Sequence, residues 1–313
     1  MLQMKLKQLQ SKQKGFTLLE LLVVITLLAV LSVGALVAYE GIGDTAAATA
    51  ASSNTAGADR AIRNYRAITQ NYPDQWDSLV TAGGLTPAFL QATKTQVAFA
   101  RLSVPVAPIL TPTVFRTAFN SAFSNVGITT LQVRLLAPTT ALVEPNLQHN
   151  EGATTVGGVA AVSDTLIRDT ANFSILPSFG TAACSVNTVA MGTKLNGLAM
   201  TAADGLRQNV INDSLGSTQC NLVLAVGFGH DAAHSTAAST VAISTAPTFV
   251  SKLINPAVSY ARYIALFHVG SDNVTVDNNI TAGEIFKKAR LLAVVDTEGN
   301  VIDQNIASQS ATN

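Results

Sequence analysis

The chain has 313 residues, of which 48% are apolar and only 12% are charged, with equal numbers of basic and acidic side chains. Its length suits one large domain or two ordinary ones, and its charged fraction is about half of the roughly 25% usual in soluble domains. The first fifteen residues hold four lysines and no acid, so the remaining chain carries 15 basic and 19 acidic side chains. That remainder shows no basic patch, so no nucleic-acid partner is expected. A weakly charged surface suits an exported or polymerised protein better than a free cytosolic one.

An apolar segment long enough to cross a membrane follows the basic leader. Residues 16–38 are almost entirely apolar, and a helix of this length reaches ~35 Å at ~1.5 Å per residue. The hydrocarbon core of a bilayer is ~30 Å thick, so the segment is sufficient to span it. Lysines precede the segment and no basic residue follows it before Arg60, which predicts a cytoplasmic leader and an exported remainder.

One carboxylate, Glu20, lies inside this apolar segment, at the fifth position counted from Phe16. Because an unpaired charge at membrane depth is costly, we expect Glu20 to serve a partner outside its own chain. A cleavable secretory signal fits poorly, since its small-residue cleavage site would follow the apolar region, whereas Gly15 precedes it here. A plain membrane anchor leaves Glu20 and the junction between Gly15 and Phe16 unexplained.

The letters KGFTLLE at residues 14–20 resemble the class III signal of type IV prepilins and pseudopilins. The resemblance implies that a prepilin peptidase cleaves after Gly15 and that the new terminal Phe16 is N-methylated. Glu20 matches the glutamate of the family, which would neutralise the Phe16 ammonium of a neighbouring copy and set the axial register. Tyr39 matches the tyrosine near the end of the apolar segment, whereas Val37 stands where many pilins carry a proline.

The residues after the apolar segment predict that the helix continues on the outside. Apolar side chains recur at helical spacing through Ile62 and Ile68, so we expect one helix over roughly 16–71, with a softer point at Gly41–Gly43. Pro73 ends it, and a short second helix is expected over Asn71–Val80, with its tryptophan as a core anchor.

From about Val97 the chain changes to short apolar runs separated by Pro, Gly and Asn. The pattern predicts an α+β fold, in which the long helix packs on a mainly antiparallel sheet. The expected parts are a leader (1–15), the long helix (16–71, with 16–38 in the membrane or filament core) and a β-rich head (72–313). An inserted or second lobe at about 105–222 stays open as an alternative. The expected strands are Val97–Val104, Gln132–Val143, Asn221–Phe228, Ser259–Val269 and a hairpin of Ala289–Asp296 with Asn300–Ile306, and a further helix is expected at Leu198–Ile211.

The two cysteines, Cys184 and Cys220, both lie outside the apolar segment. An even number of cysteines in an exported protein favours a disulfide, and closing this loop would contribute roughly 3–4 kcal/mol. Two buried free thiols are the alternative.

One loop offers oxygen ligands of the kind that Ca²⁺ prefers. Its candidate ligands are Asp272, Asn273, Asp277 and Glu284, although the spacing is not that of an EF-hand. A calcium site in the C-terminal loop is known in major pseudopilins, and the alternative here is a solvated turn. His230 and His234 would share one face of a helix and bind a metal, but no third ligand is near them, and two polar loop histidines are expected instead.

The sequence therefore predicts a structural subunit of a type IV pilus-like surface filament, a homo-polymer rather than an enzyme. The precursor would lie in the inner membrane and the assembled form at the cell surface, with the prepilin peptidase and the pilus or secretion assembly machinery as partners. One alternative is a type II secretion pseudopilin, which forms a short periplasmic pseudopilus. Another is a membrane-anchored enzyme or binding module, but neither a nucleophile elbow nor a phosphate loop is present.

Overall fold

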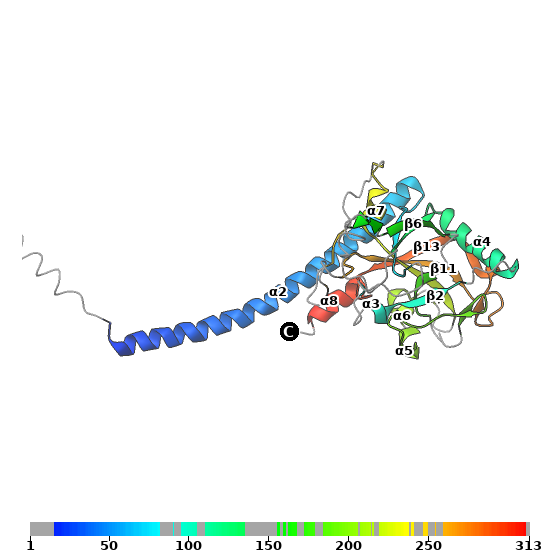
Figure 1. Ribbon diagram of the computed structural model, residues 1–313. Helices are drawn as coiled ribbons and strands as arrows, with labels where there is room; N and C mark the ends of the chain where they lie inside the picture. The colour runs from blue at the N-terminus through cyan, green and yellow to red at the C-terminus, as the bar shows by residue number, and fades with distance from the viewer. Residues whose placement is uncertain are drawn as a thin grey trace, which may run out of the picture.

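A single helix, α2 (Leu18–Thr69), runs for 52 residues and projects far beyond the β-rich head (Figure 1). It begins and ends within two residues of the predicted bounds and continues without interruption through Gly41–Gly43. At its end, Gln70 adopts the left-handed conformation and its N–H donates to the Arg66 carbonyl, which closes the last turn. In this computed structural model, the described residues are 16–81, 90, 95–104, 110–134, 155–156, 159–160, 162–167, 172–178, 184–205, 207–213, 215, 219–237, 239–240, 247–249, 254 and 259–310.

The head is built on an eight-stranded sheet in which β10 is the branch point. One edge of β10 pairs with β11, and the other is shared between β1 and β7. All pairings in this sheet are antiparallel except that of β1 with β3, which confirms a mainly antiparallel head. The strands are β1 (Trp76–Ser78), β2 (Ala100–Ser103), β3 (Thr130–Arg134), β6 (Val162–Leu166), β7 (Asn172–Leu176), β10 (Asn221–Gly227), β11 (Ile264–Ser271) and β13 (Ile285–Val295).

The sheet is covered on both faces, and β10 shows why its sequence reads as a continuous apolar run. All seven of its residues are buried. Leu222, Leu224 and Val226 point into the core on one face, whereas Val223 and Ala225 belong to the cluster on the other. Strands buried on both faces lose the alternation of apolar and polar residues that marks a half-exposed sheet.

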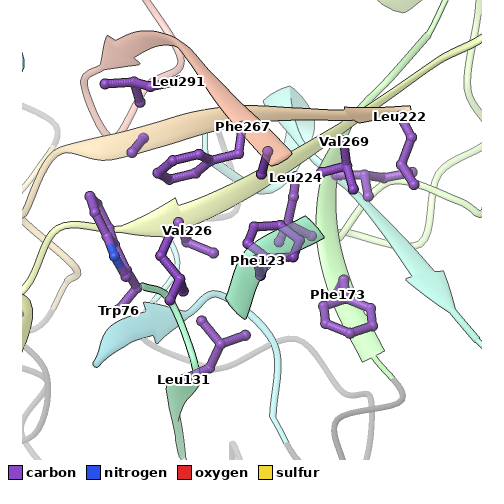
Figure 2. Close-up of a cluster of buried hydrophobic side chains, with 14 of the residues drawn as sticks. Trp76, Phe123, Leu131, Phe173, Leu222, Leu224, Val226, Phe267, Val269 and Leu291 are labelled. Carbon is purple, nitrogen blue, oxygen red and sulfur yellow. The ribbon is translucent and has the colours of Figure 1, made fainter. Parts of the chain in front are cut away.

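The head-side half of α2 and one face of the sheet share one hydrophobic core. Figure 2 shows the part of this core that lies at the strands, with Trp76, Phe123 and Phe267 among its side chains. Trp76 and Tyr72 lie against the Phe267 ring of β11, at centroid distances of 5.4 and 5.0 Å. Ile62 of α2 is fully buried in the same cluster. Each such side chain contributes roughly 1.5–3 kcal/mol when it leaves water, so this core holds the helix on the head.

Smaller elements complete the head. Helix α8 lies alongside α2, and α4 packs against β13 (Figure 1). The short helices and minor strands are α3 (Thr95–Ala98), α4 (Leu110–Ser124), α5 (Ala202–Gly205), α6 (Arg207–Ile211), α7 (His230–His234), η3 (Ala282–Glu284), α8 (Ile302–Ser310), β4 (Thr155–Val156), β5 (Val159–Ala160), β8 (Ser185–Val186), β9 (Val189–Ala190) and β12 (Asn279–Ile280).

Two of the predicted elements are wrong. The chain over Asn71–Val80 is not a helix, because Trp76–Ser78 forms strand β1 between β10 and β3. The stretch Asn300–Ile306 is not the second strand of a hairpin, because helix α8 begins at Ile302. In both places contacts with distant parts of the chain override the local pattern.

Other expected elements are present with different bounds. The predicted strand Val97–Val104 is divided between α3 and β2, and the predicted helix Leu198–Ile211 is divided into α5 and α6. Strand β3 contains the start of the predicted strand Gln132–Val143, whose residues from 135 on lie outside the described residues. Within about 105–222, where an added lobe was an alternative, β3, β6 and β7 are strands of the main sheet.

Candidate functional site

The first turn of α2 is a complete capping box. The N–H and the hydroxyl of Thr17 both donate to Oε2 of Glu20, over 2.9 and 3.0 Å. In return, the Glu20 N–H donates to the Thr17 hydroxyl over 3.2 Å. The box satisfies amide groups that have no partner within the helix, and it explains why the helix begins at Leu18.

This geometry changes the interpretation of Glu20. Thr17 is a partner of the carboxylate within its own chain, whereas the expected contact with another copy stays a prediction. The sequence contains the signal that was missed, because a threonine followed three residues later by glutamate is the capping-box pattern. All of the described contacts of the carboxylate converge on Oε2, so within the described chain Oε1 is left without a hydrogen-bond donor.

The apolar half of α2 is exposed along its whole length. Leu18–Tyr39 is a 22-residue segment with a mean hydropathy of 2.9, long and apolar enough to cross a membrane, and none of it is buried in the molecule. Phe16 before it is 84% exposed. The hydroxyls of Thr26 and Ser32 donate to carbonyls of the same helix, at Val23 and Leu28, so neither needs water.

The helix passes Val37 without a break, as expected for a segment that lacks the proline found there in many pilins. Tyr39 marks the end of the apolar segment and is 72% exposed.

The predicted calcium ligands do not form a cation cage. Asp272 accepts hydrogen bonds from the N–H groups of Asp277 and Asn278, and Asp277 accepts one from Asn279. Both oxygens of Glu284 are likewise occupied by N–H and hydroxyl donors. Among the residues that the structure describes, no group of three or more His, Cys, Asp or Glu side chains is placed to hold a metal ion. Asp272 and Glu284 are buried and accept hydrogen bonds from their own loop, so the calcium site stays a prediction.

The electrostatics of Glu284 agree with its hydrogen bonds. Burial alone would raise the pKa of this carboxyl, but the N–H groups of Thr281, Thr275 and Val274, with the Thr281 hydroxyl, outweigh it and lower the pKa to about 2. The carboxylate is thus fixed in its charged form by the backbone of its own loop.

The members of the cysteine pair, and those of the histidine pair, lie close together in the structure. Cys184 and Cys220 are joined by a disulfide with a Cα–Cα distance of 5.7 Å, and both are buried. His230 and His234 lie on helix α7 rather than in a loop, with nearly parallel rings 6.1 Å apart. Nδ1 of His230 is 2.9 Å from a carboxylate oxygen of Asp231.

Comparison with known proteins agrees with the geometry of the N-terminal segment. Residues 10–36 match the family described as the prokaryotic N-terminal methylation motif. This segment is a prepilin-type class III signal. The match includes Gly15, Phe16 and Glu20 and ends before Val37, so it does not extend to the head. A search of curated proteins and a search of solved structures found no match to the chain.

The signal and the helix together support a type IV pilin-like or pseudopilin-like precursor. A prepilin-type signal implies processing by a prepilin peptidase, and the exposed apolar helix fits a membrane-anchored precursor. The fold agrees with this assignment, since a long apolar helix is followed by a mixed α+β head with a many-stranded sheet, as in pilins.

Proposed function

We propose that this protein is a structural subunit of a type IV pilus-like surface filament. The precursor is inserted through α2 and cleaved between Gly15 and Phe16, and Phe16 is methylated. The processed copies then polymerise with their apolar helices bundled at the centre. The prepilin-type signal supports the processing step, and the fully exposed segment Leu18–Tyr39 is the observation that carries the assembly step.

The apolar segment must be shielded from water both before and after the subunit leaves the membrane. A continuous apolar surface of this length is not stable in water, and the described head covers no part of it. Lipid covers it in the precursor. Once the subunit leaves the membrane, the equivalent segments of other copies are the apolar surfaces best matched to it in length and composition, so polymerisation replaces the lipid.

The first turn supplies a polar contact within such a bundle. Cleavage would create an ammonium group at Phe16, next to the helix end where the macrodipole is already positive. The Glu20 carboxylate of a neighbouring copy would neutralise it through Oε1, while Oε2 keeps its contacts with Thr17. In the low dielectric of a helix bundle an unpaired charge is costly, so this pairing also selects one axial register.

Mass spectrometry of sheared surface material, combined with negative-stain microscopy, tests the proposal. We expect fibres in which this chain is a main component and begins at a methylated Phe16. Gly15→Ala serves as a mild control, because it should slow processing far less than Gly15→Leu. A mature chain beginning at another residue would contradict the processing step, and surface material without fibres of this chain would contradict the filament.

A further inference from the structure

A basic groove lies between the last turns of α2 and strand β13, on the head. Its volume is about 600 Å³, within the range of sites that hold small ligands. It is widely open to solvent, and four of its lining residues are cations. The lining residues are Arg63, Arg66, Ala67, Gln70, Tyr72, Lys288, Arg290 and Leu291.

Packing holds the three guanidinium groups of the groove in place. The Arg66 guanidinium lies 4.2 Å from the centre of the Tyr72 ring, and that of Arg290 lies 5.1 Å from the Phe286 ring. Arg63 is held by Asp59 over 2.8 Å and donates to the carbonyl of a β13 residue over 3.1 Å. Cations held on aromatic faces lose less freedom when an anion binds, which favours binding.

The charge of the groove contrasts with that of the chain. The processed chain would carry 15 basic and 19 acidic residues, yet six of the basic residues fall within two short segments, 60–66 and 287–290. The linear sequence shows no basic patch because more than 200 residues separate these segments. Among the described residues, Arg63 has a carboxylate partner, whereas Arg66, Lys288 and Arg290 have none.

We propose that this groove binds a multivalent oxyanion, a ligand that carries two or more phosphate or carboxylate groups. Guanidinium forks match the paired oxygens of both groups, and a lysine ammonium adds a point charge suited to phosphate. Three cations without carboxylate partners would be only partly neutralised by a monovalent anion, so the charge balance selects a multivalent one.

The groove is too far from the membrane to be a site for the headgroups of the anchoring bilayer. Arg63 lies roughly 24 residues beyond Tyr39, which corresponds to ~36 Å along a helix. At physiological ionic strength the Debye length is about 8 Å, so attraction across that distance is screened. The ligand is therefore expected on the outer side, either as a free small anion or as an anionic polymer. The proposal goes beyond filament assembly and does not depend on it.

Neighbouring residues of the same type provide matched variants. Lys287 and Lys288 are both exposed on β13, but only Lys288 lines the groove. Arg60 and Arg66 are both on α2, and only Arg66 lines it. Lys288→Glu and Lys287→Glu therefore change the net charge equally and differ only in position, as do Arg66→Glu and Arg60→Glu.

Titration calorimetry of the full chain in a non-ionic detergent, with tripolyphosphate as the probe, tests the proposal. We expect saturable binding that weakens by at least about tenfold in Lys288→Glu and by less than about threefold in Lys287→Glu. The Arg66 and Arg60 pair should differ in the same direction, which keeps the test decisive if one variant folds poorly. Citrate in place of tripolyphosphate separates carboxylate from phosphate recognition, and long-chain polyphosphate at equal phosphate concentration separates a polymer from a free anion.

Two results would overturn the proposal. One is the absence of saturable binding for all three probes. The other is equal weakening in groove and control variants, since that would indicate diffuse attraction to the whole chain, including the four leader lysines. Because all variants keep the same α2 first turn and leader, failure of this test leaves the filament proposal intact.

Discussion

Two capping boxes of the same sequence pattern, Thr-x-x-Glu, occur at opposite ends of the molecule. They differ in the contacts of one carboxylate oxygen of the glutamate, Oε1. In the first, the N–H and hydroxyl of Thr17 donate to Oε2 of Glu20 over 2.9 and 3.0 Å. In the second, Thr281 makes the same two contacts with Oε2 of Glu284, over the same distances. The contacts of Oε2 with the threonine are therefore alike in the two boxes.

The difference lies at Oε1. In Glu284, this oxygen accepts from the N–H groups of Val274 and Thr275 over 3.0 and 3.1 Å, and the residue is buried. In Glu20, no described donor reaches it, and the residue is exposed. One box is closed by its own chain and stabilises a loop, whereas the other is left open at the tip of an apolar helix. The same motif is thus fully occupied at one site, and at the other it leaves one carboxylate oxygen without a described donor.

Removal of the Glu20 carboxylate should reduce filament assembly more than any other change considered. Glu20→Ala should still be inserted and processed, but surface filament should fall by more than about tenfold, since losing one partner of a buried charge pair costs about 3–5 kcal/mol. Immunoblots of the sheared and membrane fractions measure this. Glu20→Gln is the sharper variant, because glutamine also completes a capping box but carries no charge. Filaments restored by Gln would show that capping, and not charge, is what assembly needs.

Opening the closed box should affect folding instead of assembly. In Glu284→Gln, an amide replaces the carboxylate that accepts hydrogen bonds from the N–H groups of Val274 and Thr275. Part of these bonds is lost, so the free energy of unfolding should fall by about 1–3 kcal/mol. Thermal unfolding of the full chain in detergent measures it. Asp303→Asn, an exposed change in α8, is the control and should stay within about 0.5 kcal/mol of wild type. An unchanged Glu284→Gln melting curve would contradict the folding role of the closed box.

The sequence predicted the elements that are determined by local pattern. The long helix and the central strand β10 are found within a few residues of their predicted bounds, because periodicity and a long apolar run determine them. The resemblance at residues 14–20 also identified the signal that the family comparison supports. What sequence reasoning missed at that site was the role of Thr17, although the capping pattern was readable.

The errors fall where distant residues decide the outcome. Around Pro73 the local pattern favoured a helix, but the Asp74 carboxylate accepts from the N–H groups of Thr129 and Thr130, which are more than 50 residues away. These contacts hold β1 between strands that local sequence cannot place beside it. At the C-terminus the predicted hairpin implied a turn between Asp296 and Asn300, and a turn is present there, but the segment after it docks on α2 as a helix. The basic groove could not be predicted from the sequence either, because its lining residues come from two distant segments of the chain.

The closed box should also give the protein a specific acid sensitivity. The pKa of Glu284 is lowered from 4.5 to about 2, so its contribution is fully present above about pH 4.5 and is lost as the pH falls toward 2. Other carboxylates titrate in this range as well, so the informative quantity is the difference in unfolding free energy between wild type and Glu284→Gln. That difference should shrink between pH 4.5 and pH 2, measured by denaturant titration. A constant difference would mean that Glu284 acts by shape and not by charge.

The smallest effect is expected from the other half of the open box. Thr17→Ala removes the hydroxyl that donates to Glu20 and accepts from its N–H, but the backbone N–H of residue 17 still reaches Oε2. Loss of an N-cap costs about 1 kcal/mol, so amide exchange in the first turn should speed up while filament yield changes little. Thr17→Ser is the control and should behave as wild type. If Thr17→Ala instead abolished filaments as completely as Glu20→Ala, orientation of the carboxylate by the cap would be as necessary to assembly as its charge, and the two boxes would differ less than their Oε1 contacts indicate.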